Sequence, residues 1–365
     1  MQGHHKIARS MGHVPALDGV RAAAIGVVMV AHAGLEGVVP GGFGVTLFFF
    51  LSGYLITSLL RLEAAASGGI DLKSFYLRRT VRILPPMILT VMVANLLGLA
   101  GLTGVQPTAN GFVVDLFFLT NYAPQLGVEG GGAPIPLWSL DVEEHFYIAF
   151  STLFALVLAG LRPSRAALIC GALCAVILGA RIGHWLADTP LWTIYYWSHT
   201  RLDSILFGCV LALWHNPAID RAAWKPGKAA IGAALLLLLL TFALRDEVFR
   251  QTVRYSLQGV AIFILFSAAL QSTGTVRGLL SSYPLRFIAL LSYTLYLIHV
   301  PMLKVAAQLE LPMPYAFAYA FSFAYAYAMY RLVEQPLARW RHGVEQRQRA
   351  QRPGLVGSRL ETSEP

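Results

Sequence analysis

The chain has 365 residues, of which 56% are hydrophobic and only 13% are charged. A soluble protein of this length carries roughly twice that share of charged residues and usually divides into two domains. The formal net charge of +9 would suit a nucleic-acid partner, but the placement of the basic residues, described below, argues against one. Long apolar runs recur from beginning to end, so the sequence predicts an all-α, polytopic integral membrane protein.

Apolar spans of about twenty residues predict about ten transmembrane helices. In chain order they cover residues 18–38, 44–62, 83–103, 137–160, 166–187, 197–214, 229–245, 254–272, 285–303 and 312–333. Residues 112–120 are apolar but short, which indicates a re-entrant or interfacial segment. Residues 1–33 also resemble a cleaved signal peptide. We interpret them as leading into a first transmembrane helix, because the region before the apolar stretch is too long and contains an aspartate.

Lysine and arginine define the orientation of these spans. With the N-terminus inside, the inner loops and the C-terminal tail hold most of the 28 basic residues, which is a strong positive-inside bias and accounts for the net charge. Both termini are therefore predicted to be cytoplasmic, in a multi-pass protein of the inner (plasma) membrane. We expect residues 1–342 to form a single transmembrane domain and residues 343–365 to form a polar, disordered tail.

The first predicted helix carries ionisable residues inside the membrane. A charged side chain near the bilayer centre costs about 2.5–3.5 kcal/mol, so each is a candidate for function. The spacing of Arg21 and His32 is close to three helical turns, which places them on one face, about 16 Å apart along the axis. Asp18 falls on the same side of the helix. Arg21 alone also fits a snorkelling interfacial arginine, whereas the depth of His32 favours a functional histidine.

The fourth predicted helix carries a second polar face. Ser139, Glu143 and Tyr147 follow one another at one-turn spacing along it. Glu143 lies about 9 Å below the outer surface, near the depth estimated for His32. Polar residues at the very start of this helix could simply be hydrated at the membrane surface. Glu143 lies deeper, so this explanation fits it less well.

Further candidates enter the membrane from the same side. Arg201 and Asp203 fit either an internal ion pair or a part of the site, and His299 fits either a hydrogen-bonded core histidine or a part of the site. Three cysteines lie in apolar spans without any further ligand, so we expect core packing and no metal site; they are Cys170, Cys174 and Cys209.

A cluster of arginines, Arg78, Arg79 and Arg82, stands on the cytoplasmic side immediately before the third predicted helix. Arg79 and Arg82 share a helix face, a spacing suited to phosphate oxygens, although positive-inside anchoring explains the number of arginines equally well. Taken with the membrane residues, the charges suggest an anion site inside and an acid/base site nearer the outside. There, a neutral imidazole oriented by a carboxylate could remove a proton from a hydroxyl.

Seven segments in order, from residue 17 to about residue 340, resemble the membrane-bound acyltransferase family 3. These are O-acyltransferases of cell-surface polysaccharides and of some secondary metabolites. The segments are LDGVRAAAIGVVMVAHAG, GGFGVTLFFFLSGYLIT, FYLRRTVRILPP, PLWSLDVEEHFY, TRLDSILFG, LSYTLYLIHVP and VEQPL. Each alone is a weak signal, whereas all seven in family order are specific.

The resemblance implies an acyl-CoA donor, usually acetyl-CoA, that enters from the cytoplasm, and transfer of the acyl group to a hydroxyl. The family's Arg-x10-His, Arg-x-x-Arg and Ser-x-x-x-Glu motifs fall on Arg21 and His32, Arg79 and Arg82, and Ser139 and Glu143. His145 stands where the family frequently has Gln, which leaves open which histidine is the base. Some relatives carry a fused extracytoplasmic esterase-like domain; here we expect a second transfer step either to be made by another protein or not to exist.

We expect the coenzyme phosphates to bind near Arg78, Arg79 and Arg82, with Arg21 helping to hold the donor. His32 would act as general base or carry the acyl group, and Glu143 would orient it or handle the proton. The remaining candidates are expected to bind substrate or to support the site; they are Asp18, Ser139, Tyr147, Arg201, Asp203 and His299.

The expected partners are membrane lipid, acyl-CoA and a carbohydrate or glycolipid acceptor, with polysaccharide-assembly proteins as further partners. An acceptor of the macrolide type, a small molecule, stays open. The alternative from another class is a transporter or exporter of a polar metabolite, because buried charges among about ten helices suit it as well. A scaffold subunit of a polysaccharide-assembly complex is a third possibility.

Overall fold

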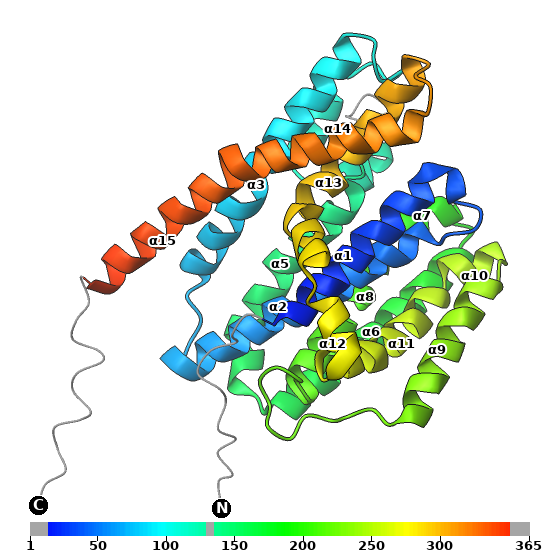
Figure 1. Cartoon of the computed structure of the whole chain (residues 1–365). Helices are drawn as coiled ribbons and strands as arrows, with labels where there is room; N and C mark the ends of the chain where they lie inside the picture. Colours follow the sequence, from blue (N-terminus) through cyan, green and yellow to red (C-terminus); the bar gives the residue numbers. More distant parts are fainter. Residues whose placement is uncertain (1–13, 129–134, 351–365) are drawn as a thin grey trace, which may run out of the picture.

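The computed structural model describes residues 14–128 and 135–350, and within these ranges the chain forms helices and no β-strand (Figure 1). The longer helices are α1 (Pro15–Val30), α2 (Gly41–Ser67), α3 (Leu72–Leu99), α5 (Trp138–Leu156), α6 (Pro163–Leu186), α8 (Ser198–Trp214), α9 (Lys228–Ala243), α11 (Arg254–Leu270), α13 (Tyr283–Gln308), α14 (Pro314–Met329) and α15 (Gln335–Ala350). Shorter elements are η1 (Ala31–Leu35), α4 (Ala109–Leu116), η2 (Thr120–Leu126), η3 (Leu158–Gly160), α7 (Leu191–Tyr196), α10 (Glu247–Gln251), α12 (Gly274–Leu280) and η4 (Tyr330–Glu334).

Every predicted span falls on a helix, but fewer helices are suited to crossing a membrane. By length and composition, six helices of the described chain qualify, and α11 with α12, bent by 102°, would make a seventh. The expectation of about ten crossings is therefore not supported. The physical reason is visible in α8, which has 17 residues and is buried among other helices. An apolar run indicates that its side chains are shielded from water. A protein interior shields them as well as a bilayer does, so an apolar run alone does not predict a membrane crossing.

Helix α3 begins earlier than the sequence predicted, at Leu72 instead of residue 83. Asp71 caps it, because its carboxylate accepts hydrogen bonds from the backbone N–H of Ser74 at 3.0 Å and from the Ser74 hydroxyl at 2.7 Å. The adjacent prolines Pro85 and Pro86 lie inside the helix. The three clustered arginines consequently stand on α3 itself and not before it.

Helices α2 and α8 form the centre of the bundle, and glycines allow their close approach. A Cβ on Gly53 of α2 would overlap the carbonyl oxygen of Ile205, and a Cβ on Gly208 of α8 would overlap that of Phe50. Small residues at such a crossing let two backbones pack directly against each other. This crossing fixes the position of the polar residues that the two helices carry.

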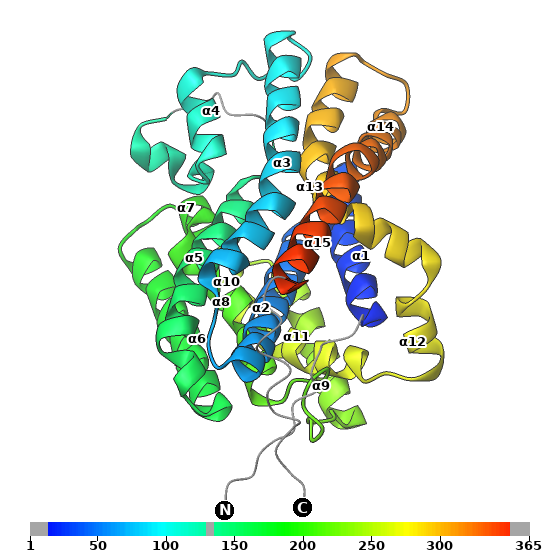
Figure 2. The ribbon, with the colours of Figure 1, turned by 90° about the vertical axis from the view of Figure 1, so that its left-hand side faces the viewer.

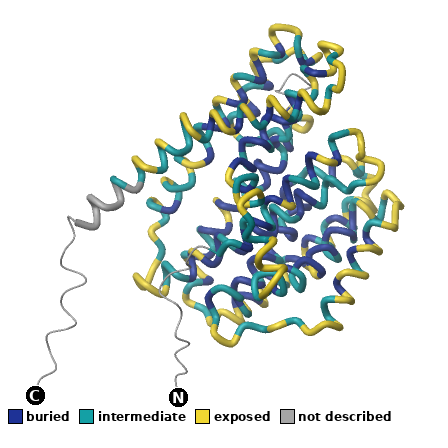
Figure 3. Tube along the Cα trace, in the orientation of Figure 1, coloured by how far each residue is buried: buried dark blue, intermediate teal, exposed yellow. Residues whose placement is uncertain are grey.

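The other helices surround this centre. Helix α1 packs between α2 and α13, α6 and α11 flank α8, and α9 covers α11. Helix α14 packs on α13, and α15 continues from it along α3 (Figure 2). Buried residues follow the central helices, while exposed residues gather at helix ends and loops (Figure 3).

The predicted disordered tail begins inside α15, so residues 343–350 are helical instead. The reason is composition, since Glu, Gln, Arg and Ala all favour a helix. Residues 351–365 lie outside the described residues.

Candidate functional site

A cavity of about 130 Å³ lies among α1, α2, α3, α5 and α13. Its polar lining combines three arginines, a carboxylate and several hydroxyls: Arg21, Ser52, Arg79, Arg82, Ser139, Glu143, Tyr147, Ser292, Tyr293 and Tyr296. Six residues proposed from the sequence thus line one cavity, although they come from three separate helices. The shared faces predicted for Arg79 with Arg82, and for Ser139 with Glu143 and Tyr147, are confirmed.

Glu143 has a defined set of partners in this cavity. The Ser52 hydroxyl donates to its Oε1 at 3.0 Å, and the Tyr147 hydroxyl donates to its Oε2 at 2.9 Å. The guanidinium carbon of Arg79 lies 3.4 Å from the centre of the Tyr147 ring, a close cation–π contact. Both carboxylate oxygens are therefore oriented by neighbouring side chains, and a cation stands beside them.

A second, wider cavity of about 820 Å³ adjoins the first, and Arg21 and Arg82 line both. Its charged lining consists of Asp18, Arg21, Arg82, Arg286, Glu334 and Arg341. Four guanidinium groups against two carboxylates give this lining a net positive charge, which makes it suitable for an anion. Arg286 and Arg341 were not predicted as site residues, because no sequence motif links them to the arginines of α3.

Arg78 faces away from both cavities. Its Nη2 atom forms an ion pair with Oε2 of Glu63 at 3.1 Å, and it appears in neither lining. Neighbouring residues on a helix point in different directions. The expected phosphate cluster is therefore divided, with Arg79 and Arg82 at the cavities and Arg78 at the α2–α3 connection.

His32 lies beside the smaller cavity and does not line it. It stands in η1, a π-helical turn at the end of α1, where its Nδ1 is 3.1 Å from Nε2 of His299. Tyr296 connects this pair to the cavity, since its hydroxyl is 2.6 Å from Oγ of Ser139 and its ring centre is 5.8 Å from that of His299. The sequence predicted that Glu143 would orient His32. In the structure, His32 instead pairs with His299, and Glu143 accepts from Ser52 and Tyr147.

With this geometry in place, the comparison with known proteins identifies the family. The family model of acyltransferase family 3, described as an acyltransferase domain, matches residues 14–331. The chain belongs to this acyltransferase family. The resemblance drawn from the seven sequence segments is thereby confirmed.

Several curated relatives are similar to this chain. A Staphylococcus aureus (strain COL) protein, provisionally named an O-acetyltransferase, is 30% identical over 80% of this chain and 51% of its own length. The peptidoglycan O-acetyltransferase OatA of Listeria monocytogenes is 26% identical over 80% of this chain and 50% of its own length. The O-acetyltransferase OatA of Staphylococcus aureus (strain NCTC 8325 / PS 47) is 27% identical over 80% and 51%. The chain thus spans about half the length of these relatives. No solved structure matches it significantly.

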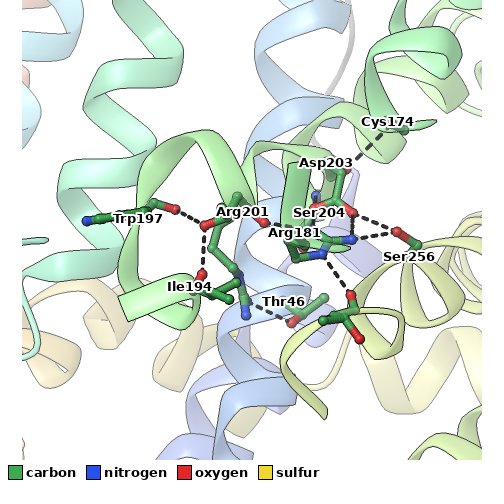
Figure 4. A network of polar contacts seen from close by, with 11 residues as sticks. Thr46, Cys174, Arg181, Ile194, Trp197, Arg201, Asp203, Ser204 and Ser256 are labelled. Atoms are coloured by element: carbon green, nitrogen blue, oxygen red, sulfur yellow. Dashed lines mark hydrogen bonds and ion pairs between the residues drawn. The ribbon is translucent and has the colours of Figure 1, made fainter. Parts of the chain in front are cut away.

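Two candidates of the acyltransferase domain, Arg201 and Asp203, do not pair with each other. Asp203 instead forms a fully buried, two-point ion pair with Arg181 of α6, with N–O distances of 2.7 and 2.6 Å (Figure 4). Arg201 points toward Thr46 of α2, 3.4 Å away, and its guanidinium carbon lies 3.6 Å from the centre of the Tyr255 ring. The internal ion pair interpretation was wrong, because residues two apart on a helix do not face each other.

The cysteines are buried and free, as expected for core residues. Within residues 14–128 and 135–350, no group of three or more His, Cys, Asp or Glu side chains is arranged to hold a metal ion. The side chains in and near the smaller cavity supply a carboxylate, hydroxyls, arginines and an imidazole pair.

Proposed function

We propose that this protein is a membrane O-acyltransferase of the inner (plasma) membrane. In this proposal it moves an acyl group, most simply acetyl, from acyl-CoA to a hydroxyl of a cell-surface carbohydrate or glycolipid. The observation that carries the proposal is that Arg21 and Arg82 line both cavities. An arginine-rich cavity therefore shares two of its arginines with a narrower one that holds a carboxylate and hydroxyls.

The wide cavity suits the phosphates of the donor. Arginine is the preferred side chain for phosphate oxygens because its guanidinium donates two parallel hydrogen bonds. A volume of about 820 Å³ lies within the range of small-molecule sites, roughly 300–1,000 Å³. The narrower cavity of about 130 Å³ is proposed to take the pantetheine arm, which would lead the acyl group toward His32 beyond Tyr296, and it is too small for the nucleotide end of the donor.

The reaction itself requires a base for the acceptor hydroxyl. In the proposed step the hydroxyl oxygen attacks the thioester carbonyl carbon, its proton passes to His32, and the carbon–sulfur bond breaks. The sulfur leaves with the electron pair of that bond and takes up a proton to give the free thiol of CoA. Glu143, held by Ser52 and Tyr147, balances the arginines that line the same cavity.

The acceptor is proposed to be a glycan outside the membrane. One similar protein is named a peptidoglycan O-acetyltransferase, which favours a polysaccharide hydroxyl over a macrolide-type acceptor. Peptidoglycan fragments are accordingly the first acceptor to test. Polysaccharide-assembly proteins are proposed as partners that would present the glycan.

The first test uses the purified protein in lipid vesicles, with radiolabelled acetyl-CoA and soluble peptidoglycan fragments. The second compares, by mass spectrometry, the surface glycans of cells with and without the protein. We expect transfer by the wild type and a loss of about 10²–10⁴-fold in His32→Ala, the usual contribution of a general base. His215→Ala is the matched control, because His215 lines neither cavity and contacts the Ala222 carbonyl and the Trp214 ring instead. Absence of transfer to any glycan, with surface glycans unchanged in cells, would leave the transporter as the better interpretation.

Direct transfer and an acyl-histidine intermediate differ in what becomes labelled. In a rapid-quench experiment with radioactive acetyl-CoA, direct transfer predicts no labelled protein. An acyl-histidine predicts label on His32 that disappears when acceptor is added.

A further inference from the structure

The histidine pair beside the cavity has a hydrogen-bonding pattern that defines where its protons are. His299 is fully buried. Its Nδ1 lies 3.1 Å from the carbonyl oxygen of Leu295 and 2.8 Å from that of Tyr296. Carbonyl oxygens only accept hydrogen bonds, so Nδ1 of His299 must carry a proton. In a neutral ring the other nitrogen, Nε2, is then an acceptor.

The proton positions of His32 follow from those of His299. Nε2 of His299, the acceptor, faces Nδ1 of His32 at 3.1 Å, so Nδ1 of His32 must be the donor. A neutral His32 with its proton on Nδ1 has an unprotonated Nε2. That nitrogen is the one that can take a proton from a hydroxyl.

We propose that His299 is a positioning residue that holds His32 in the tautomer required of a general base. This inference rests on the proposed function, in which His32 accepts the proton of the acceptor hydroxyl. The role is the one that a carboxylate usually has beside a catalytic histidine. Here a neutral imidazole, itself held by two backbone carbonyls, takes that place.

Other assignments fit the contacts less well. His299 cannot be the base, because both of its nitrogens are engaged and no part of it is exposed. Glu143 accepts from Ser52 and Tyr147, whereas the hydrogen-bond partner of His32 Nδ1 is His299. His145, which departs from the family pattern, bonds through Nδ1 to Oγ of Ser198 at 2.7 Å and so belongs to the contact between α5 and α8 instead of the His32–His299 pair.

The surrounding elements fix the position of the histidine pair. His32 lies in the π-helical turn that ends α1, a type of distortion common at functional sites. Gly34 follows with a φ of 85°, which favours glycine, and turns the chain toward α2. The Tyr319 hydroxyl of α14 donates to the Met29 carbonyl one turn before His32. The backbone on both sides of His32 is therefore fixed.

The inference is tested with two substitutions of His299. His299→Leu removes the acceptor that faces His32, while His299→Gln can present its amide oxygen at the position of Nε2. We expect His299→Leu to lower kcat about tenfold or more, with KM for acetyl-CoA unchanged, because a histidine held in the wrong tautomer can cost up to about 10⁴-fold in kcat. His299→Gln should recover most of that loss.

A spectroscopic measurement reports the tautomer without reference to activity. In protein labelled with ¹⁵N-histidine and reconstituted in lipid, the signals of His32 are identified by their absence in His32→Ala. We expect neutral wild-type His32 to show the proton on Nδ1, and His299→Leu to move it partly or fully to Nε2. This readout stands even if His299→Leu proves poorly folded, because the wild-type spectrum alone distinguishes the two tautomers.

The outcomes separate this inference from the function on which it rests. A wild-type His32 with its proton on Nε2 would overturn the inference, and so would a well-folded His299→Leu with unchanged kcat. If His32→Ala is inactive in either case, the acyltransferase proposal still holds. If the wild type transfers no acyl group, the proposed function fails, and the proposed positioning role fails with it even if the spectrum shows the Nδ1 tautomer.

Discussion

Replacing Arg181 by methionine is expected to destabilise the protein strongly. Arg181 and Asp203 are both completely buried, and the guanidinium donates to both carboxylate oxygens. It also donates to the carbonyls of Thr252 and Thr200, each at 2.7 Å, and to the Ser256 hydroxyl at 2.6 Å. Every N–H direction of this side chain is therefore used inside the molecule.

The expected magnitude follows from the charge left behind. Removing one partner of a buried ion pair costs about 3–5 kcal/mol, because the other charge stays buried without compensation. Arg181→Met should therefore lower the free energy of unfolding by that amount. Adding Asp203→Leu removes the stranded carboxylate, so the double variant should lose about 1–3 kcal/mol less than the sum of the two single changes.

Arg201 provides the matched comparison on the same helix as Asp203. Its Nε and Nη1 atoms are buried without a partner among the described residues, and its main contacts are aromatic rings. Arg201→Met loses a cation–π contact of up to about 2 kcal/mol but also removes an incompletely paired charge. Its effect should be additive with Asp203→Leu within about 0.5 kcal/mol.

The assay is reversible unfolding in mixed micelles with increasing SDS, followed by tryptophan fluorescence of the seven tryptophans. The three single variants, the two double variants and the wild type give two double-mutant cycles that share Asp203→Leu. Coupling of Asp203 to Arg201 equal to or greater than its coupling to Arg181 would refute the arrangement of charges in Figure 4.

Three further predictions concern other parts of the molecule. Gly53→Ala should cost about 1–3 kcal/mol because its Cβ would overlap a backbone carbonyl of α8, whereas Gly171→Ala on α6 meets open space and should cost nothing. Asp71→Ala should cost about 1 kcal/mol through loss of the α3 cap. Hydrogen bonds from the first turn of α3 lower the pKa of Asp71, so this contribution is complete near neutral pH and is lost as pH falls through that pKa. Arg82→Gln should raise KM for acetyl-CoA about tenfold or more, and Arg78→Gln should barely change it.

Each of these has a result that would contradict it. Equal stability of Gly53→Ala and Gly171→Ala in the thermal midpoint would mean that α2 and α8 do not approach so closely. Asp71→Asn keeps a capping oxygen without titrating, so a pH dependence identical to that of the wild type would exclude the cap as its source. Equal KM values for the two arginine variants would place the donor phosphates away from the wide cavity.

Local spacing was enough to predict the parts of the site that lie on one helix. Arg79 and Arg82 share a face of α3, and Ser139, Glu143 and Tyr147 share a face of α5, as the helical period requires. Both faces line the same cavity. The start of α3 was predicted too late, because it was placed where the apolar run begins, whereas the helix begins earlier, at the Asp71 cap.

Helical spacing does not predict contacts between segments that are distant in the sequence. His32 with His299, and Arg181 with Asp203, join residues whose helices meet only because other helices fix their crossing. The sequence by itself determined the helical class, the apolar character and the polar face of each helix, because these depend on a period of 3.6 residues. Which faces meet was decided by tertiary packing, through close approaches such as that of Gly53 and Gly208. A buried charge pairs with the group that packing brings within hydrogen-bonding distance, whether or not that group is close in the sequence.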